Sequence, residues 1–369
     1  IEYIKTVDAL TPEQPFFVYY APGATHAPHH PTPEWIEKIS EMHLFDEGWD
    51  KLRDTIFANQ KKLGVLPEDA KLTPWPEDLI KHWDQLNETE RKLFIKQVDV
   101  FAAYVAYTDH EIGRVVQAVE DLGKLDNTLI IYITGDNGTS SEGGPTGTPN
   151  EVASVQGLHL PVEAQMKYYD VWGSDQTYPH MSVGWTWAFG TPFSWTKMVS
   201  SHFGGTKQGT AISWPAVIKD KGGIRNQFHH VVDIVPTILE AAGVPVPEEI
   251  DGIQQTPMEG VSMVYTFDEK QADAPSTHVT QYFEIAGDHA IYHDGWILST
   301  KVMRVPWDNS GTADKHPENW PWELYDLSKD WTQYNDCLLY TSDAADDSKR
   351  GLVWGGGGGV GGGGGGGGG

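Results

Sequence analysis

The order of apolar and polar residues predicts strands and helices in turn along the first part of the chain. The apolar run PFFVYY (residues 15–20), bounded by proline and by Ala-Pro-Gly, predicts a buried strand that ends in a loop. Residues 32–93 are rich in tryptophan, proline and charge, which indicates helices broken by loops. Apolar residues then recur at helical spacing over 91–125, so we expect a long helix that could break near Thr108, with Gly123 at its C-terminal cap.

The next apolar runs predict a sheet with covered faces. TLIIYIT (residues 128–134) follows the long helix, and an apolar strand after a helix is typical of a parallel sheet with both faces covered. Residues 209–218 (GTAISWPAVI) predict another buried strand, and residues 229–244 predict a helix closed by Gly243. Residues 140–201 are rich in glycine, proline and tryptophan with weak periodicity, and we interpret them as an excursion that covers a ligand site.

The C-terminal part predicts a smaller, antiparallel module. Residues 278–300 alternate in polarity, which indicates two antiparallel strands around a Gly-Asp turn with one face in water. Residues 322–330 (WELYDLSKD) predict one more strand. The predicted fold class is therefore α/β, with a mainly parallel sheet between helices over residues 1–248 and a β-rich subdomain over 249–336.

The composition changes abruptly after this module. From Cys337 the sequence reads CLLYTSDAAD and then becomes almost pure glycine, which cannot contribute to a core. A flexible linker is one interpretation, although such linkers usually contain serine. We favour a second one, in which residues 337–369 are the translated read-through of a sequencing adapter, and we leave them out of the fold.

Charge and hydropathy exclude some partners. The chain carries 26 basic and 52 acidic residues, so its net charge of −26 repels nucleic acid and anionic lipid. No stretch reaches the roughly 18 to 20 apolar residues of a membrane span. The chain starts at isoleucine rather than methionine, without a signal-peptide pattern, and this start looks cut. The sequence thus leaves the compartment open between a bacterial periplasm and cytoplasm.

Two strand ends carry candidate chemistry. Asp136 and Asn137 follow the strand over 128–134 and offer two hard oxygen ligands, which suit Ca²⁺ or Mg²⁺, although Asp-Asn-Gly is also ordinary turn chemistry. His26 follows the strand over 15–20, where an imidazole could donate to an anionic substrate or protonate a leaving oxygen. Ligands of parallel sheets bind at the carboxyl ends of strands, where all three residues lie.

Other polar residues have simpler explanations. His26, His29 and His30 together suggest zinc, but this stretch has no cysteine and Pro28 interrupts the ligand spacing, so we do not expect zinc there. Lys197 by itself is an ordinary surface charge. We assign structural roles to two further histidine pairs, which are His229 with His230 and His289 with His293.

Five segments together resemble one protein family. They are residues 15–30, 110–140, 184–207, 221–247 and 281–300. In this order they are similar to bacterial arylsulfatases of the sulfatase family, which belongs to the alkaline-phosphatase-like superfamily of metal-dependent hydrolases. The resemblance extends from about residue 15 to about residue 332, and it implies the same mixed, mainly parallel sheet with a small C-terminal antiparallel sheet.

The resemblance also implies roles for individual residues. Asp136 and Asn137 match the family's metal pair, which usually holds Ca²⁺. His26, in an Ala-x-His-x-Pro context, matches the histidine that contacts the sulfate and assists the leaving oxygen. Lys197 matches the lysine that neutralises sulfate charge, and His202 is a further candidate one turn later.

The family's nucleophile is a hydrated formylglycine, which a formylglycine-generating enzyme makes from cysteine in a C-x-P-S-R motif. No such motif occurs in the 369 residues, and Cys337 lacks its context. The resemblance places that motif, an Asp pair that completes the metal site, and a Lys and a His before residue 1. It therefore implies an incomplete fragment, inactive by itself, of a sulfatase whose α/β domain lacks its N-terminal part and whose C-terminal subdomain is truncated.

Three functions remain open. The first is hydrolysis of small-molecule or glycan sulfate esters by the intact parent. The second is hydrolysis of phosphonate or phosphate esters by the same chemistry. The third is non-catalytic binding of a sulfated ligand, and an upstream C-x-P-S-R motif would separate it from the two enzymes.

Overall fold

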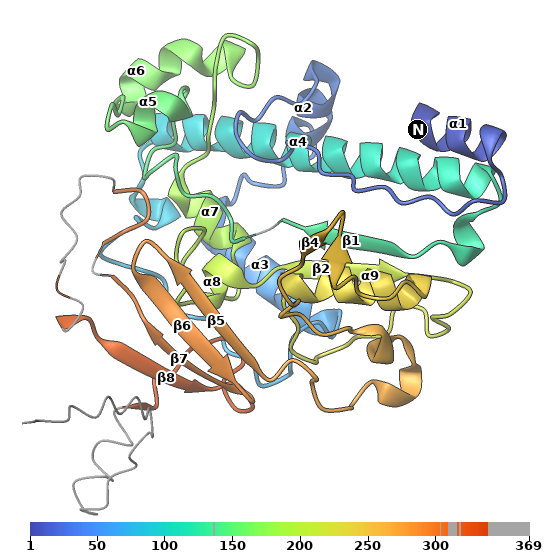
Figure 1. Cartoon of the computed structure of the whole chain (residues 1–369). Coiled ribbons are helices and arrows are strands. Elements are labelled where there is room, and N and C mark those ends of the chain that lie inside the picture. The colour runs from blue at the N-terminus through green and yellow to red at the C-terminus, as the bar shows by residue number, and fades with distance from the viewer. Residues whose placement is uncertain (136, 303, 309–315, 317–318, 339–369) are drawn as a thin grey trace, which may run out of the picture.

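The computed structural model describes residues 1–135, 137–302, 304–308, 316 and 319–338. Asp136 and most of the predicted tail lie outside these described residues. Figure 1 shows one long helix, α4, spanning the molecule, with the two strands β1 and β2 below it and the sheet β5–β8 at the lower left. The helices of eight or more residues are α1 (Glu2–Leu10), α2 (Pro33–Ser40), α3 (Gly48–Lys62), α4 (Glu88–Asp121) and α9 (Ile234–Ala242).

Short elements connect these helices. The short α-helices are α5 (Glu151–Val155), α6 (Val162–Gln165), α7 (Val183–Phe189) and α8 (Phe203–Thr206). The 3₁₀ helices are η1 (Trp83–Gln85), η2 (Leu125–Asn127), η3 (Met166–Val171), η4 (Val231–Asp233), η5 (Val264–Phe267) and η6 (Glu269–Gln271). The excursion expected over 140–201 therefore consists of short helices joined by turns.

Helix α4 confirms the predicted long helix but not its break. Asn87 caps its N-terminus, where the Asn87 side chain accepts from the Glu90 N–H at 2.9 Å and the Glu90 carboxylate accepts from the Asn87 N–H at 2.8 Å. The helix continues through Thr108, whose hydroxyl donates to the Tyr104 carbonyl at 2.8 Å and so stays within the helix. Gly123 follows with φ of 68°, the left-handed conformation of a glycine that ends a helix.

Tryptophans form the centre of the helical core. The Trp49 and Trp185 rings are 1% and 0% exposed and meet edge to face, with centroids 5.5 Å apart. The Trp185 indole N–H donates to the Phe94 carbonyl at 2.9 Å, so its polar atom is satisfied inside the core. A side chain at Gly184 would collide with the Trp49 ring, so glycine is required where α7 approaches α3.

The α/β class is confirmed, but one strand pairing differs from the prediction. β1 (Ile130–Thr134) and β2 (Gly209–Ser213) pair antiparallel, with Ile130 opposite Ser213 and Thr134 opposite Gly209. β1 is half-buried rather than fully covered. Within the described residues no strand pairs parallel to β1, because β2 is its only ladder partner and returns in the opposite direction.

The strand predicted over residues 15–20 does not form. These residues are extended, but they have no strand assignment and no backbone hydrogen bond to another described segment. Phe17 and Tyr19 are 67% and 85% exposed. The prediction was wrong because apolar composition favours a strand only when a neighbouring strand supplies its hydrogen bonds.

The C-terminal antiparallel sheet is confirmed with one more strand than expected. It contains β5 (Thr280–Ile285), β6 (Asp288–His293), β7 (Trp296–Thr300) and β8 (Trp322–Asp326) in that spatial order. Ala286-Gly287 and Asp294-Gly295 both have positive φ and form two tight turns within 278–300, where we expected one. A further two-stranded hairpin joins β3 (Glu249–Ile250) to β4 (Ile253–Gln254).

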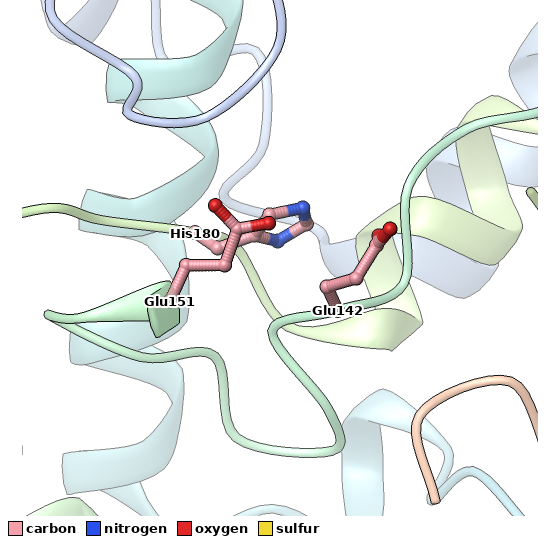
Figure 2. Close-up of side chains that lie close together, drawn as sticks. All are labelled: Glu142, Glu151 and His180. Atoms are coloured by element: carbon pink, nitrogen blue, oxygen red, sulfur yellow. The ribbon is translucent and has the colours of Figure 1, made fainter. Parts of the chain in front are cut away.

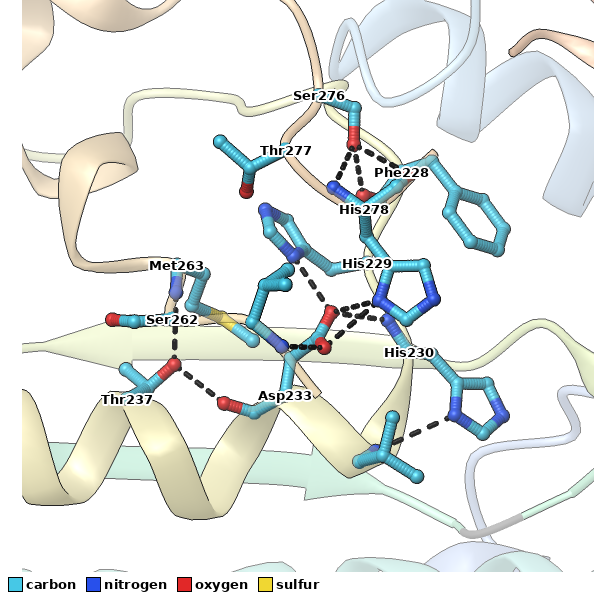
Figure 3. Close-up of polar contacts among 12 residues, drawn as sticks. Phe228, His229, His230, Asp233, Thr237, Ser262, Met263, Ser276, Thr277 and His278 are labelled. Carbon is cyan, nitrogen blue, oxygen red and sulfur yellow. Dashed lines mark hydrogen bonds and ion pairs between the residues drawn. The ribbon is translucent and has the colours of Figure 1, made fainter. Parts of the chain in front are cut away.

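A buried carboxylate holds the start of α9 against the entry to the sheet (Figure 3). Asp233 is fully buried, and its carboxylate accepts from the backbone N–H groups of His230 and Val261 at 2.9 and 2.8 Å. The Nδ1 atoms of His229 and His278 lie 2.8 and 2.9 Å from the same carboxylate. The structural role expected for His229 agrees with this contact.

These contacts determine the charge state of Asp233. Burial acts to raise the pKa of Asp233, but the two backbone N–H groups and the two imidazoles outweigh it and lower the pKa below its usual range. The ionised form therefore stabilises the fold above the unfolded pKa of about 4, and this contribution is lost as the pH falls through the lower folded pKa.

We expect Asp233→Asn to lower the free energy of unfolding by about 3 kcal/mol or more at pH 7, because the amide leaves buried donors without a charged acceptor. Urea unfolding of the wild type, of this variant and of Asp273→Asn, an exposed control, measures the difference. The difference should begin to shrink below about pH 4, where Asp233 protonates in the unfolded wild type, and should be smallest below the lower folded pKa. An equal loss in both variants would contradict the role of Asp233.

Candidate functional site

Two glycine-containing segments meet at the end of β1. The Gly138 N–H donates to the Gly205 carbonyl at 3.1 Å, and the Lys197 N–H donates to the Thr139 carbonyl at 3.1 Å. A Cβ at Gly138 would collide with the Gly204 carbonyl oxygen, so this approach requires glycine. The loop after β1 therefore lies directly against the segment that carries Lys197.

Two of the predicted site residues come together. The Lys197 ammonium lies 3.3 Å from Nε2 of His26, although the two residues are 171 positions apart. The Nδ1 atom of His26 lies 2.9 Å from the Ala27 carbonyl, so Nδ1–H donates there and Nε2 faces Lys197. The side-chain nitrogen atoms of His26 and Lys197 therefore lie next to each other, although they come from distant parts of the sequence.

Lys197 has a second partner that the sequence analysis missed. Its ammonium forms an ion pair of 2.6 Å with Oε1 of Glu142, and the two side chains are only 19% and 12% exposed. Burial acts to raise the pKa of Glu142, but the hydrogen bonds from Lys197 and Ser140 outweigh it and lower the pKa. Glu142 is therefore an ionised partner that holds Lys197 in place.

The hydrogen-bond network continues from Glu142 into the interior. The Ser140 hydroxyl contacts Oε2 of Glu142, and it also lies 2.7 Å from Nε2 of His180. His180 is fully buried, and its Nδ1 lies 3.0 Å from the Met181 carbonyl. Burial lowers the pKa of His180, which favours the neutral imidazole with Nδ1–H donating to that carbonyl.

The predicted metal pair is described only in part. Asp136 lies outside the described residues, so the structure does not test its role. Asn137 is half-buried in the loop after β1, and no side-chain hydrogen bond joins it to another described residue. Its amide oxygen is free to bind a hard cation, which fits calcium chemistry but provides only one ligand.

His202 belongs to a different part of the structure. Its imidazole Nε2 lies 3.1 Å from the Glu323 carboxylate of β8, and its Nδ1 lies 3.0 Å from the Ser201 hydroxyl. These contacts connect α8 to the C-terminal sheet. Among the described residues, no hydrogen bond or ion pair joins His202 to Lys197 or His26, so its candidate site role gains no support.

The other two histidines of the first loop, His29 and His30, contact the helical core and the backbone near Thr177. His29 is 2% exposed and packs against Phe101 and His180, with ring centroids 4.9 and 5.0 Å away. Nε2 of His30 lies 2.8 Å from the Thr177 carbonyl. These contacts use His29 in packing and His30 in a backbone contact.

A different group of ligand-type atoms lies beside Lys197. Oxygen atoms of Glu142 and Glu151 and a ring nitrogen of His180 all lie within 4.8 Å of one another, and Figure 2 shows the three side chains converging. Glu151 is 7% exposed, and burial together with Glu142 raises the pKa of Glu151. Nothing in the sequence pointed to this group, because the residues follow no motif and come from three separate segments.

The family assignment agrees with this geometry. The model of the family described as Sulfatase matches residues 1–244, so the chain belongs to the sulfatase family. An uncharacterised sulfatase of Schizosaccharomyces pombe is 30% identical over 330 residues, which cover 88% of this chain and 55% of that protein. An arylsulfatase of Klebsiella aerogenes is 27% identical over 263 residues, covering 70% of this chain and 52% of its own length. The chain thus spans about half the length of these relatives.

Solved structures give weaker matches. The crystal structure of Ps i-CgsB is 17% identical with a TM-score of 0.48, covering 94% of this chain and 51% of that one. The structure of BT4656 with D-glucosamine-2-N,6-O-disulfate is 18% identical with a TM-score of 0.39, covering 68% of this chain and 37% of that one. Among the described helices of the present chain, none is long and apolar enough to cross a membrane.

We expect Lys197→Gln to raise the pKa of Glu142, because burial then acts without the opposing charge-assisted hydrogen bond. Carbon-detected NMR of labelled glutamate carboxyl groups measures the titration. Lys167→Gln removes an exposed lysine and serves as the matched control. A Glu142 titration midpoint that is the same in both variants would show that the ion pair does not form in solution.

Proposed function

We propose that this chain is part of a sulfate ester hydrolase, in which His26 and Lys197 bind the sulfate group of the substrate. The observation that carries the proposal is the 3.3 Å approach of the Lys197 ammonium to the His26 imidazole in a chain of the sulfatase family. Two nitrogen donors beside each other can bind an oxyanion through charge-assisted hydrogen bonds.

The surroundings suggest how these residues act. Lys197 is held by Glu142 at 2.6 Å in the free protein, and an arriving sulfate would offer its ammonium a second anion. Lys197 would then neutralise part of the charge that develops on the sulfate oxygens. Nδ1–H of His26 donates to the Ala27 carbonyl, so His26 would pass a proton from Nε2 to the leaving oxygen only as the imidazolium, which carries a proton on both ring nitrogens.

The resemblance supplies the other components. Asp136 and Asn137 would hold Ca²⁺, with Mg²⁺ as an alternative, and such an ion makes a hydroxyl of the formylglycine hydrate more acidic. That nucleophile would come from a C-x-P-S-R segment absent from these 369 residues, and a formylglycine-generating enzyme would produce it. The 369-residue chain alone is therefore proposed to be inactive.

The proposed substrates are aryl or glycan sulfates. The name of the Klebsiella aerogenes relative supports an aryl ester, and a further relative, from Bacteroides thetaiotaomicron, is named N-acetylglucosamine-6-O-sulfatase and is 23% identical over 235 residues. Phosphonate or phosphate esters, and binding of a sulfated ligand without turnover, are outcomes that the next experiment separates.

Hydrolysis of 4-nitrophenyl sulfate tests this proposal. We expect a polypeptide that carries a C-x-P-S-R segment before residue 1, matured by the formylglycine-generating enzyme, to release nitrophenol faster from the sulfate than from the matching phosphonate. Lys197→Ala in this polypeptide should lower kcat/KM for the sulfate by about 100-fold or more, while Lys167→Ala should leave it unchanged. Faster turnover of the phosphonate would favour the alternative hydrolase, and binding without turnover would favour the sulfated-ligand binder.

Asp136→Ala in the same active polypeptide should remove the bound calcium and nearly all activity, because a carboxylate ligand is lost. Elemental analysis of the purified protein together with the nitrophenol assay measures both effects. Asp273→Ala, at an exposed position, is the control. Full calcium content with an unchanged rate would exclude the metal role of Asp136.

A further inference from the structure

We propose that Glu142, Glu151 and His180 form a second metal site, which binds a divalent ion of the zinc class. The site shares no residue with the predicted calcium pair Asp136-Asn137. The proposal does not depend on sulfate hydrolysis, since metal binding here needs neither the nucleophile nor the calcium pair.

The backbone holds two of the three ligands in fixed positions. The segment before α5 pairs with residues 178–180, where Thr148 and His180 exchange two hydrogen bonds of 3.0 and 2.9 Å. The Glu151 N–H donates to the Tyr178 carbonyl at 2.8 Å, so Glu151 begins α5 next to the same segment. Figure 2 shows the Glu151 carboxylate beside the His180 ring and Glu142 facing both from the loop after β1.

The spacing of the donor atoms suits a small ion. Two carboxylate oxygens and one ring nitrogen lie within 4.8 Å of one another. Zinc binds such atoms at about 2.0 to 2.2 Å, so ligands on a common ion are roughly 3 to 4 Å apart. Small rotations of the two glutamate side chains would therefore bring all three atoms to one ion.

His180 has the orientation and protonation of a metal ligand. Its Nδ1–H donates to the Met181 carbonyl at 3.0 Å, which leaves the lone pair of Nε2 facing the group. Metal-binding histidines commonly use one ring nitrogen for the ion and the other N–H for a carbonyl or carboxylate. The ring is fully buried, so it cannot turn to find a solvent partner.

The burial of Glu151 is a second, independent indication that a cation binds at this site. The residue is 93% buried, since only 7% of its surface is exposed, and its carboxylate has no hydrogen bond or ion pair with another described residue. An ionised carboxylate in such a position is costly without a partner. The ammonium of Lys197 is already paired with Glu142, so it forms no ion pair with Glu151.

The number of hydrogens available for hydrogen bonds at Ser140 also indicates that a cation binds here. The Ser140 hydroxyl touches Oε2 of Glu142 and Nε2 of His180, but it has only one hydrogen to donate. With the His180 proton on Nδ1, both of these partners are acceptors. A cation bound to Nε2 and the carboxylates would satisfy the acceptor that receives no hydrogen from Ser140.

The donor set selects the class of ion. One imidazole and two carboxylates suit Zn²⁺, which binds both ligand types and often keeps a position for water. Calcium prefers six to eight oxygen ligands and does not use imidazole in such sites. Because Glu142 also holds Lys197, an ion at this site would share the carboxylate that positions the sulfate-binding lysine.

Titration of the metal-free 369-residue chain with ZnCl₂ tests the proposal, with isothermal calorimetry as the readout. We expect one ion per chain with a dissociation constant in the micromolar range or below. Glu151→Gln should weaken binding by at least about 100-fold, since loss of a ligand costs no less than loss of an outer-shell partner. Glu163→Gln, the same change at an exposed position on α6, should bind zinc like the wild type.

Further variants and a spectrum separate this site from others. Asp136→Asn should retain zinc binding, and Co²⁺ in place of zinc should give visible absorption bands that disappear in Glu151→Gln. Because the Glu151 carboxylate has no hydrogen bond or ion pair to lose among the described residues, that variant should keep the wild-type circular dichroism spectrum. Absence of zinc binding by the wild type, equal binding by Glu151→Gln, or loss of binding in Asp136→Asn would each overturn the proposal. These readouts do not involve ester hydrolysis, so failure of the sulfatase assay leaves them unaffected.

Discussion

The candidate site depends on the close contact between the loop after β1 and the segment that contains Lys197. Gly138 and Gly204 approach so closely that a Cβ at Gly138 would collide with the Gly204 carbonyl oxygen. Two backbone hydrogen bonds, from Gly138 to Gly205 and from Lys197 to Thr139, hold this contact. These bonds join backbone atoms, and they place the Lys197 segment beside the loop that carries Glu142.

Buried and half-buried carboxylates are compensated by nearby donors at three places in this acidic chain. Asp233 is surrounded by imidazoles and backbone N–H groups, Glu142 by Lys197 and Ser140, and Glu323 by His202. In each case hydrogen-bond donors that include one from a distant segment compensate the desolvation of a carboxylate. These contacts therefore also hold the two segments together. Glu151 departs from this pattern, and for that reason its environment points to a cation.

Local sequence predicted the elements whose signals are local. The spacing of apolar residues and Gly123 predicted α4, and Gly243, in the left-handed conformation, ended α9 as expected. Local sequence did not predict the absence of a strand at residues 15–20 or the antiparallel pairing of β1. Strand formation and strand direction both depend on a partner from elsewhere in the chain. The third strand within 278–300 could have been recognised, since Asp294-Gly295 is a standard turn signal.

The sequence by itself determined the family, the α/β class and the identity of His26 and Lys197 as site candidates, because motifs preserve residue types in a readable order. Only the tertiary structure decided which side chains meet. It joined His26 to Lys197 across 171 positions, placed His202 with Glu323 instead, and gathered Glu142, Glu151 and His180. Which side chains meet depends on backbone contacts between distant segments and on which residues become buried. Neither of these can be read from the residues of a single segment.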